Sequence, residues 1–377
     1  MAANRRVIWA TLSLDLFLWG LLNSIFGPSS LRIMGEFNAD FTTVGFAVSA
    51  MSFGAMFSIF TGRYADKYGS YYISRLSLFF LGLATFLTGF TNSIFLFIML
   101  SFLAGISIGT FQASFTQAIL DLYPEAKFKM LSFNAAFFGV GATIGPTVTA
   151  LLISSFNDWR IAYIIFGGLL AASVFFQFSL KSAGKERMTP SIDRREQKGD
   201  YFLVLLTALF FMFIMGTGIN SWLPTYIVTA NKANYLEASA LLSCFWAAGT
   251  VMRGLVWKII DKAGEKKVLV YFSLVGSISS FISIFLIGFV PNAVVWGVVG
   301  LVNVPLNPLV MAVAYSKYRH NPGRVIGRLV SFGNFGALIS APLIGVINNI
   351  SGPNIATLVI PISGLVVTLM FLKLKMD

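Results

Sequence analysis

The stretch at positions 62–69 reads GRYADKYG, and a second version, WKIIDKAG, stands at positions 257–264. Asp66 of the first and Asp261 of the second are 195 positions apart, and each stretch lies between two long apolar runs. An acid, a base and a glycine therefore occur at the same offsets in two short loops. This repetition predicts a chain made of two similar halves.

The composition indicates that both halves lie in a membrane. Of the 377 residues, 56% are hydrophobic and only 11% are charged, and the mean hydropathy is +0.79, whereas a soluble domain usually has about 25% charged residues. The apolar runs are long enough for helices that cross the hydrocarbon core and satisfy their own backbone hydrogen bonds. We predict an all-α polytopic membrane protein with twelve spans, at 7–31, 41–61, 72–90, 94–120, 128–154, 161–180, 201–229, 237–258, 267–289, 293–315, 325–347 and 354–372.

The two loops resemble the loop signature of the major facilitator superfamily, and the resemblance extends over essentially the whole chain. It implies two pseudo-symmetric six-helix halves, at 1–180 and 201–377, joined by a charged cytoplasmic linker at 181–200. It also implies a secondary transporter that works by alternating access. Residues of the two loops are then candidates for gating, with solvated loop charges as the alternative: Asp66, Lys67, Gly69, Asp261, Lys262 and Gly264.

Other parts of the two halves also correspond. Asn23 followed by Pro28 in the first span is matched by Asn220 followed by Pro224 in the seventh, so we expect these two long spans to tilt or to break near their prolines. The fifth span contains the string GVGATIGP at 139–146, which resembles the glycine-proline motif of family members. Its small residues suit close helix packing rather than substrate contact, and we assign that role to Gly141, Gly145 and Pro146.

The distribution of lysine and arginine predicts the orientation. With a cytoplasmic amino terminus, 23 of these residues fall in inner segments, Arg75 among them, and only Arg32, Arg160 and Lys232 fall outside. Both termini are therefore expected in the cytoplasm, and the cell (inner) membrane is the expected location. The net charge of +12 reflects this topology, so no nucleic-acid partner is expected.

Asp15 is the one acid placed inside an apolar span, and Arg253 is the one base placed well inside a span. A carboxyl group in a membrane is costly, so it should have a task, and proton coupling is the first candidate. A structural role between helices is the alternative. Arg253, within MRGL at 252–255, resembles the helix-8 arginine of the monocarboxylate-transporter branch, and its planar fork suits a carboxylate substrate. The alternative is that it only extends to the cytoplasmic edge of the membrane or joins the loop contacts. Because both residues lie at similar depth, we expect both side chains to face a central cavity.

Neutral polar and aromatic residues favour a second substrate class, a sugar-like solute. Buried amides can equally serve helix packing through hydrogen bonds. With Arg253, the candidate substrate-binding residues are Trp19, Asn23, Gln112, Asn220, Trp222, Tyr226 and Asn303.

Several classes of protein are disfavoured. The single cysteine and the single histidine, His320 in a basic loop, argue against a zinc cluster and a serine–histidine pair. No phosphate-binding glycine–lysine motif is present. We therefore expect neither an enzyme nor a bound metal or cofactor. We also expect a monomer in the bilayer that binds a small solute and protons. Symport, antiport and uniport stay open, as does a membrane receptor or scaffold that transports nothing.

Overall fold

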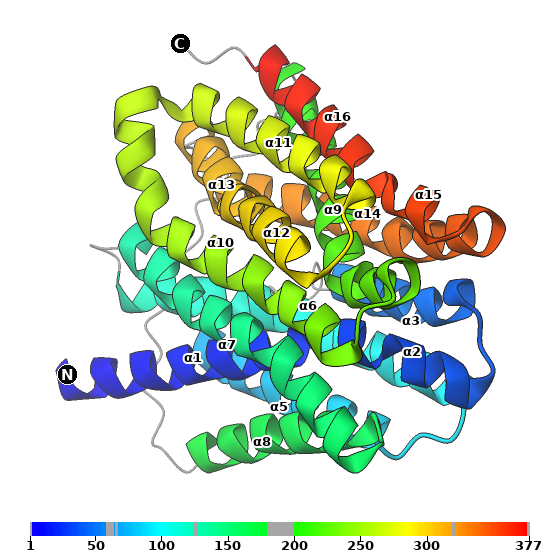
Figure 1. Cartoon of the computed structure of the whole chain (residues 1–377). Helices are drawn as coiled ribbons and strands as arrows, with labels where there is room; N and C mark the ends of the chain where they lie inside the picture. The colour runs from blue at the N-terminus through cyan, green and yellow to red at the C-terminus, as the bar shows by residue number, and fades with distance from the viewer. Residues whose placement is uncertain are drawn as a thin grey trace. The chain divides into compact units, whose positions relative to one another are not determined.

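The structure, a computed structural model, describes residues 2–57, 64, 67–123, 127–178, 200–318 and 322–374. Within these ranges the secondary structure is helical (Figure 1). Asp66 and all of the expected linker except Asp200 lie outside the described residues.

Within the described residues, the twelve expected spans coincide with helices or with consecutive helices separated by a short break. In the part of the chain that is described, nine helices are long and apolar enough to cross a membrane, and the bent pair α1–α2 adds a tenth. The remaining two spans correspond to shorter apolar helices, Phe41–Met56 and Arg160–Phe175. The predicted fold class is thus confirmed.

The chain divides into two compact units, Met1–Ala39 with Phe46–Pro190, and Asp40–Gly45 with Ser191–Asp377. The helices of the first unit, blue to green in Figure 1, are α1 (Ala2–Asn23), α2 (Phe26–Phe37), α3 (Phe41–Met56, whose first residues belong to the second unit), α5 (Ser70–Thr88), α6 (Ile94–Leu122), α7 (Lys127–Phe156) and α8 (Arg160–Phe178). Those of the second unit are α9 (Asp200–Asn231), α10 (Tyr235–Ala263), α11 (Glu265–Ile282) with the 3₁₀ turn η2 (Ser283–Phe285), α12 (Phe289–Asn303), α13 (Leu306–Lys317), α14 (Pro322–Ser351), α15 (Pro353–Thr357) and α16 (Val359–Lys373).

Proline affects the expected spans differently according to its position. The first span breaks between α1 and α2 with a 40° bend, and Pro28 lies in the first turn of α2, where a missing N–H removes no helical hydrogen bond. The expected alternative of a break near Pro224 is not realised, because α9 continues through this residue. An unexpected break separates α12 from α13 at Val304–Pro305.

Helices pair in the same order in each unit. The pairs α1–α7, α5–α8 and α5–α6 of the first unit correspond to α9–α14, α11–α16 and α11–α12 of the second. Glycines at equivalent positions allow the backbones to approach: a Cβ atom on Gly105 would lie 1.9 Å from the carbonyl oxygen of Met51, and one on Gly300 would lie 1.9 Å from that of Phe245. These two glycines are themselves 195 positions apart, the offset of the two loops.

Gly141 illustrates the packing requirement. A Cβ atom there would lie 2.0 Å from the carbonyl oxygen of Phe17, so α1 and α7 would have to separate. We expect Gly141→Ala to lower the stability by about 1–3 kcal/mol, the usual range for overpacking, measured as a lower midpoint of thermal unfolding in detergent. Gly216→Ala is the matched control, because a Cβ atom on Gly216 would meet nothing within 4 Å and alanine favours the helix. Equal midpoints for the two variants would contradict the packing role.

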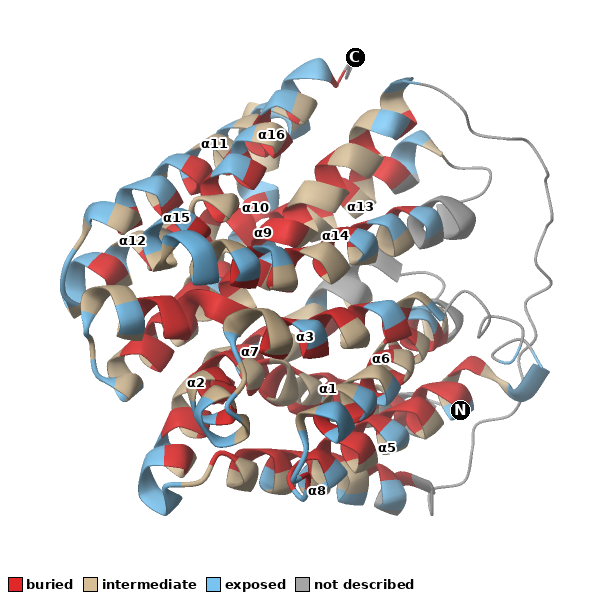
Figure 2. Ribbon diagram, turned by 90° about the vertical axis from the view of Figure 1, so that its right-hand side faces the viewer, coloured by how far each residue is buried: buried red, intermediate tan, exposed pale blue. Residues whose placement is uncertain are grey.

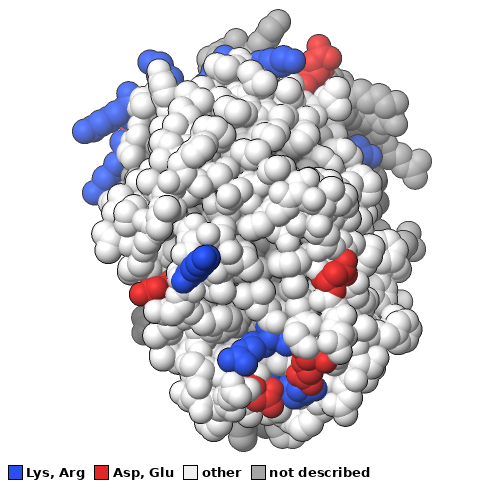
Figure 3. Space-filling model, turned by 45° about the vertical axis from the view of Figure 1, so that its right-hand side comes forward, with Lys and Arg blue, Asp and Glu red and all other residues white. Residues whose placement is uncertain are grey.

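The outer surfaces suit a lipid environment. Helices such as α11 and α16 carry both buried and exposed residues along their length (Figure 2). The exposed ones include the large side chains of Tyr271, Phe281 and Leu369. On the face in Figure 3 most of the visible surface is formed by uncharged residues. This is the surface expected of helices that contact hydrocarbon.

Candidate functional site

Asp15 lies on α1 inside the first unit and is completely buried. Its Oδ1 atom accepts a hydrogen bond from Nε2 of Gln177 on α8, at 2.7 Å. Its Oδ2 atom and the Oε1 atom of Gln177 are both buried without a hydrogen-bond partner among the described residues. Two buried acceptor atoms of this pair therefore lack a donor. A proton on the carboxyl group would supply a donor for one of them.

Arg75 on α5 completes this cluster and is only 2% exposed. Its Nη1 atom donates to the main-chain carbonyl of Gln177 at 2.6 Å, and its guanidinium carbon lies 4.3 Å from the ring centroid of Tyr71. The Tyr71 hydroxyl is in turn 2.9 Å from Oγ1 of Thr11, one turn before Asp15 on α1. The contacts thus form a closed ring through α1, α8 and α5, which we call the Asp15 cluster.

The cluster corrects two expectations. Arg253 is not the one base well inside a span, because Arg75, counted above as an inner loop charge, is buried within α5. Asp15 does not face an open cavity in this structure, since its side chain is closed off from solvent and bonded to Gln177. The sequence shows that Arg75 and Gln177 each lie in an apolar run, but it does not show that the two residues contact one another. The expected pairing of Asp15 with Arg253 joins the two units and stays a prediction.

In the second unit, polar candidates on α9 contact neighbouring helices. Oδ1 of Asn220 accepts a hydrogen bond from Nε1 of Trp246 on α10, at 3.2 Å. Nε1 of the buried Trp222 donates to the carbonyl of Ala341 on α14, also at 3.2 Å. The Tyr226 hydroxyl is buried and has no hydrogen-bond partner among the described residues. Trp222 is thus engaged in helix packing, whereas Tyr226 retains a free donor.

The other candidate binding residues lie on α1, α6, α10 and α12. Asn303, at the end of α12, is buried against Gly276 of α11, and neither atom of its amide group has a partner among the described residues. Arg253 lies on α10 and is half-buried, with its Nε atom shielded from solvent. The remaining three are half-buried residues of α1 and α6, namely Trp19, Asn23 and Gln112.

Gly69 and Gly264 of the two loops adopt backbone conformations with positive φ angles. Gly69 has φ 97° and directly precedes α5, and Gly264 has φ 84° and separates α10 from α11. This region of φ is readily accessible only to glycine, so the glycines have a local structural reason to recur. Asp261 and Lys262 are exposed and lie in the last turn of α10, not beyond its end as expected. Lys67 places Nζ 5.1 Å from the centroid of the Tyr68 ring.

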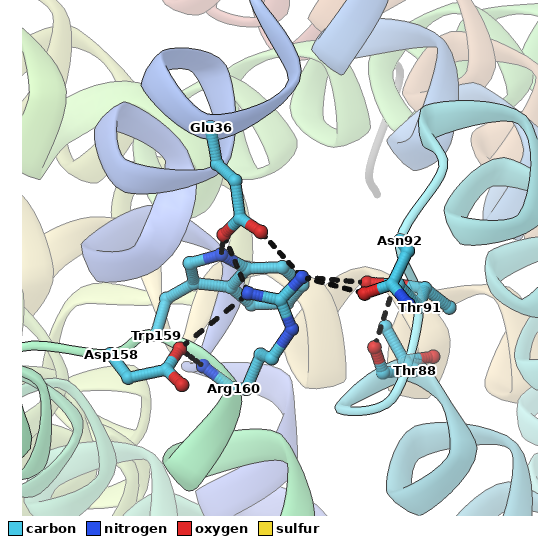
Figure 4. A network of polar contacts seen from close by, with 7 residues as sticks. All are labelled: Glu36, Thr88, Thr91, Asn92, Asp158, Trp159 and Arg160. Carbon is cyan, nitrogen blue, oxygen red and sulfur yellow. Dashed lines mark hydrogen bonds and ion pairs between the residues drawn. The ribbon is translucent and has the colours of Figure 1, made fainter.

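A second polar network connects α2, α8 and the turn between α5 and α6 (Figure 4). Arg160 contacts both carboxylate oxygens of Glu36, with Nη1 to Oε2 at 2.6 Å and Nη2 to Oε1 at 2.5 Å. Nε1 of Trp159 also donates to Oε2 of Glu36, at 2.6 Å. Nη2 of Arg160 donates to the carbonyl of Thr91 at 2.8 Å. The network thus joins α2, the start of α8 and the turn between α5 and α6, on the side of the membrane that is predicted to be external.

This network should stabilise the first unit. We expect Arg160→Gln to lower the free energy of unfolding by about 1–2 kcal/mol, above the ~0.2–1 kcal/mol of an exposed pair because the contact is bidentate. Arg32→Gln, which removes an exposed arginine of α2, is the control. Thermal unfolding of the single variants, of Glu36→Gln and of the double variant would give the coupling energy. Purely additive effects would show that Glu36 and Arg160 do not stabilise one another.

The described residues contain no group of three or more histidine, cysteine, aspartate or glutamate side chains that could hold a metal ion. The Asp15 cluster offers a carboxyl group that can take up a proton, and both it and the Glu36–Arg160 network offer hydrogen bonds.

Comparisons with known proteins agree with this architecture. The family model of the Major Facilitator Superfamily matches residues 12–341. The "Protein TsgA homolog" of Buchnera aphidicola subsp. Baizongia pistaciae (strain Bp) is 25% identical over 259 residues, covering 68% of this chain and 66%, just under two thirds, of the relative. "Multidrug resistance protein 2" of Bacillus subtilis (strain 168) is 23% identical, covering 93% and 90%.

Two further matches bear on substrate and fold. The "4-hydroxybenzoate transporter PcaK" of Pseudomonas aeruginosa PAO1 is 24% identical over 310 residues, covering 70% of this chain and 68% of the relative. Among solved structures, a bacterial homologue of the human lysosomal transporter Spinster superposes with a TM-score of 0.77 at 12% identity, covering 98% of this chain and 94% of the other. At that identity the likeness concerns the fold.

Proposed function

Because the chain belongs to the Major Facilitator Superfamily, a family of membrane transporters, we propose that it is a proton-coupled secondary transporter of a small organic anion. It would work by alternating access between two six-helix halves, at 1–180 and 201–377, with both termini in the cytoplasm and as a monomer in the cell membrane. Asp66 and Asp261 would stabilise one access state through contacts made only in that state.

The single observation that carries the coupling is the environment of Asp15. An ionised carboxylate is unfavourable in a buried place where one of its oxygen atoms lacks a donor, and Oδ2 of Asp15 is such an atom. A protonated carboxyl group would still accept from Gln177 through Oδ1, and its proton would supply the missing donor, while the buried Arg75 keeps the positive charge of the cluster. Release of this proton would require the Asp15 cluster to open, which couples proton movement to a change in helix contacts.

The substrate class is supported by Arg253. A half-buried guanidinium group on a membrane helix suits bidentate contact with a carboxylate. A relative named for a carboxylate, 4-hydroxybenzoate, supports the same class. In a symport the proton taken up by Asp15 would move with the anion, so low external pH should strengthen uptake.

A neutral, sugar-like solute is the alternative, favoured by the amide and aromatic groups of the second unit. Asn220 with Trp246, and the free hydroxyl of Tyr226, offer hydrogen bonds without charge. Another relative is named a multidrug resistance protein, so the names of the relatives do not all indicate a carboxylate. A thermal-shift screen of carboxylates and sugars across pH would separate the classes, because a ligand that binds only the folded form raises its stability with concentration. Stabilisation by sugars and not by carboxylates would contradict the anion proposal.

A further inference from the structure

A long apolar groove follows the seam between α5 and α6 in the first unit. Its volume is about 740 Å³, and it extends along α5 from Tyr72 to Leu87 and along α6 from Thr110 to Leu100. At 1.5 Å per residue the α5 side is about 22 Å long, compared with ~30 Å for the whole hydrocarbon core. Side chains on its walls are well exposed, including Phe80 at 51% and Leu103 at 50%. The groove therefore has the length of an extended fatty-acyl chain and opens away from the packed helix interior.

The few polar groups along the groove require no polar occupant. The Ser77 hydroxyl donates to the carbonyl of Ile73 at 2.9 Å, and the Ser107 hydroxyl donates to that of Leu103 at 3.0 Å. The Thr110 hydroxyl donates to that of Ile106 at 2.8 Å. Since these hydrogen atoms already have acceptors in their own helices, hydrocarbon can fill the groove without leaving a buried donor unsatisfied.

One end of the groove differs from the rest. Tyr68 and Tyr72 line it there and are 48% and 41% exposed, and Lys67 lies over the Tyr68 ring, with Nζ 5.1 Å from its centroid. Aromatic residues of this kind favour the depth of lipid headgroups. The lysine distribution predicts that this end faces the cytoplasm, where the leaflet carries anionic lipids that attract cations.

From this combination we propose that the groove is a binding site for an anionic phospholipid. One acyl chain lies between α5 and α6, and the headgroup phosphate lies at the cytoplasmic end beside Lys67 and Tyr68. The proposal depends on the membrane location of the helices and not on the substrate or coupling assigned above. The site differs from the general lipid contact of the surface because it holds one chain in a defined groove with a cation at its end.

Native mass spectrometry of the full-length protein released from nanodiscs with equal phosphatidylglycerol and phosphatidylcholine tests the proposal. The parent protein should retain phosphatidylglycerol in preference. Lys67→Gln should reduce this preference about fivefold, which corresponds to ~1 kcal/mol for one cation near an anionic surface. Lys258→Gln, which removes an exposed cation of α10, should leave it unchanged.

A second pair of variants tests the groove itself. Leu103→Trp should fill the groove and release the retained lipid, whereas Leu96→Trp changes a residue of the same helix that is 47% exposed and does not line the groove. Equal retention of both lipids by the parent, or equal lipid loss in the two tryptophan variants, would overturn the proposal. Both tryptophan variants should keep the unfolding midpoint of the parent, because both positions are exposed.

Discussion

Replacement of Asp15 by asparagine should abolish accumulation of substrate against a gradient while leaving downhill exchange. Asparagine cannot carry the proton, but its Oδ1 atom can still accept the hydrogen bond that Gln177 donates to Asp15 at 2.7 Å. The Asp15 cluster should therefore persist and the protein should fold. We expect the ratio of internal to external substrate under an inward proton gradient to fall about 5- to 150-fold, the range that typical coupling free energies of 1–3 kcal/mol allow.

The matched control is Asp200→Asn, which removes an exposed acid from the first turn of α9. It should accumulate substrate like the parent. Undiminished accumulation by the Asp15→Asn protein would rule Asp15 out as the coupling group. Loss of every transport mode, together with a lower unfolding midpoint, would assign it the structural role between α1 and α8 instead.

Replacement of Arg253 by glutamine should weaken carboxylate transport strongly. Hydrogen bonds to a charged group contribute about 1.5–3 kcal/mol, so the KM for a carboxylate should rise on the order of 10- to 100-fold. Arg253→Lys keeps the charge but loses the planar fork, and it should show an intermediate increase. Initial rates of uptake into proteoliposomes at several substrate concentrations would measure both effects.

Lys258→Gln provides the control for charge, since it removes an exposed cation from the same helix. If Arg253→Gln transports a carboxylate as well as the parent, the anion proposal fails. The sugar-like alternative, with Asn220, Trp222 and Gln112 as candidate contacts, would then be the next to test.

Sequence predicted the helices well because each must be about 20 residues long and apolar to cross a bilayer. The break at Val304–Pro305 was missed, since a proline in an apolar run can either kink a helix or be accommodated, as Pro224 is in α9. Which occurs depends on the neighbouring helices that satisfy the freed carbonyl groups. The recurrence of Gly69 and Gly264 was visible, but their positive φ angles, which explain it, were not.

The candidate site was predicted only in part. Asp15 stood out because an acid in an apolar helix is rare, whereas Arg75 was indistinguishable from the many cations that end helices on the inner side. Its guanidinium group donates to the carbonyl of Gln177, which is 102 positions away on another helix, and no pattern in a single helix reveals such a contact. Polar partners between membrane helices have to be found in three dimensions.

The most direct test of the central claim is uptake of a labelled carboxylate by the purified parent protein in proteoliposomes with an imposed pH gradient, acidic outside. The account predicts transient accumulation above the external concentration, abolished when a protonophore removes the gradient. Uptake that only equilibrates and does not respond to the gradient or to the protonophore would contradict proton coupling.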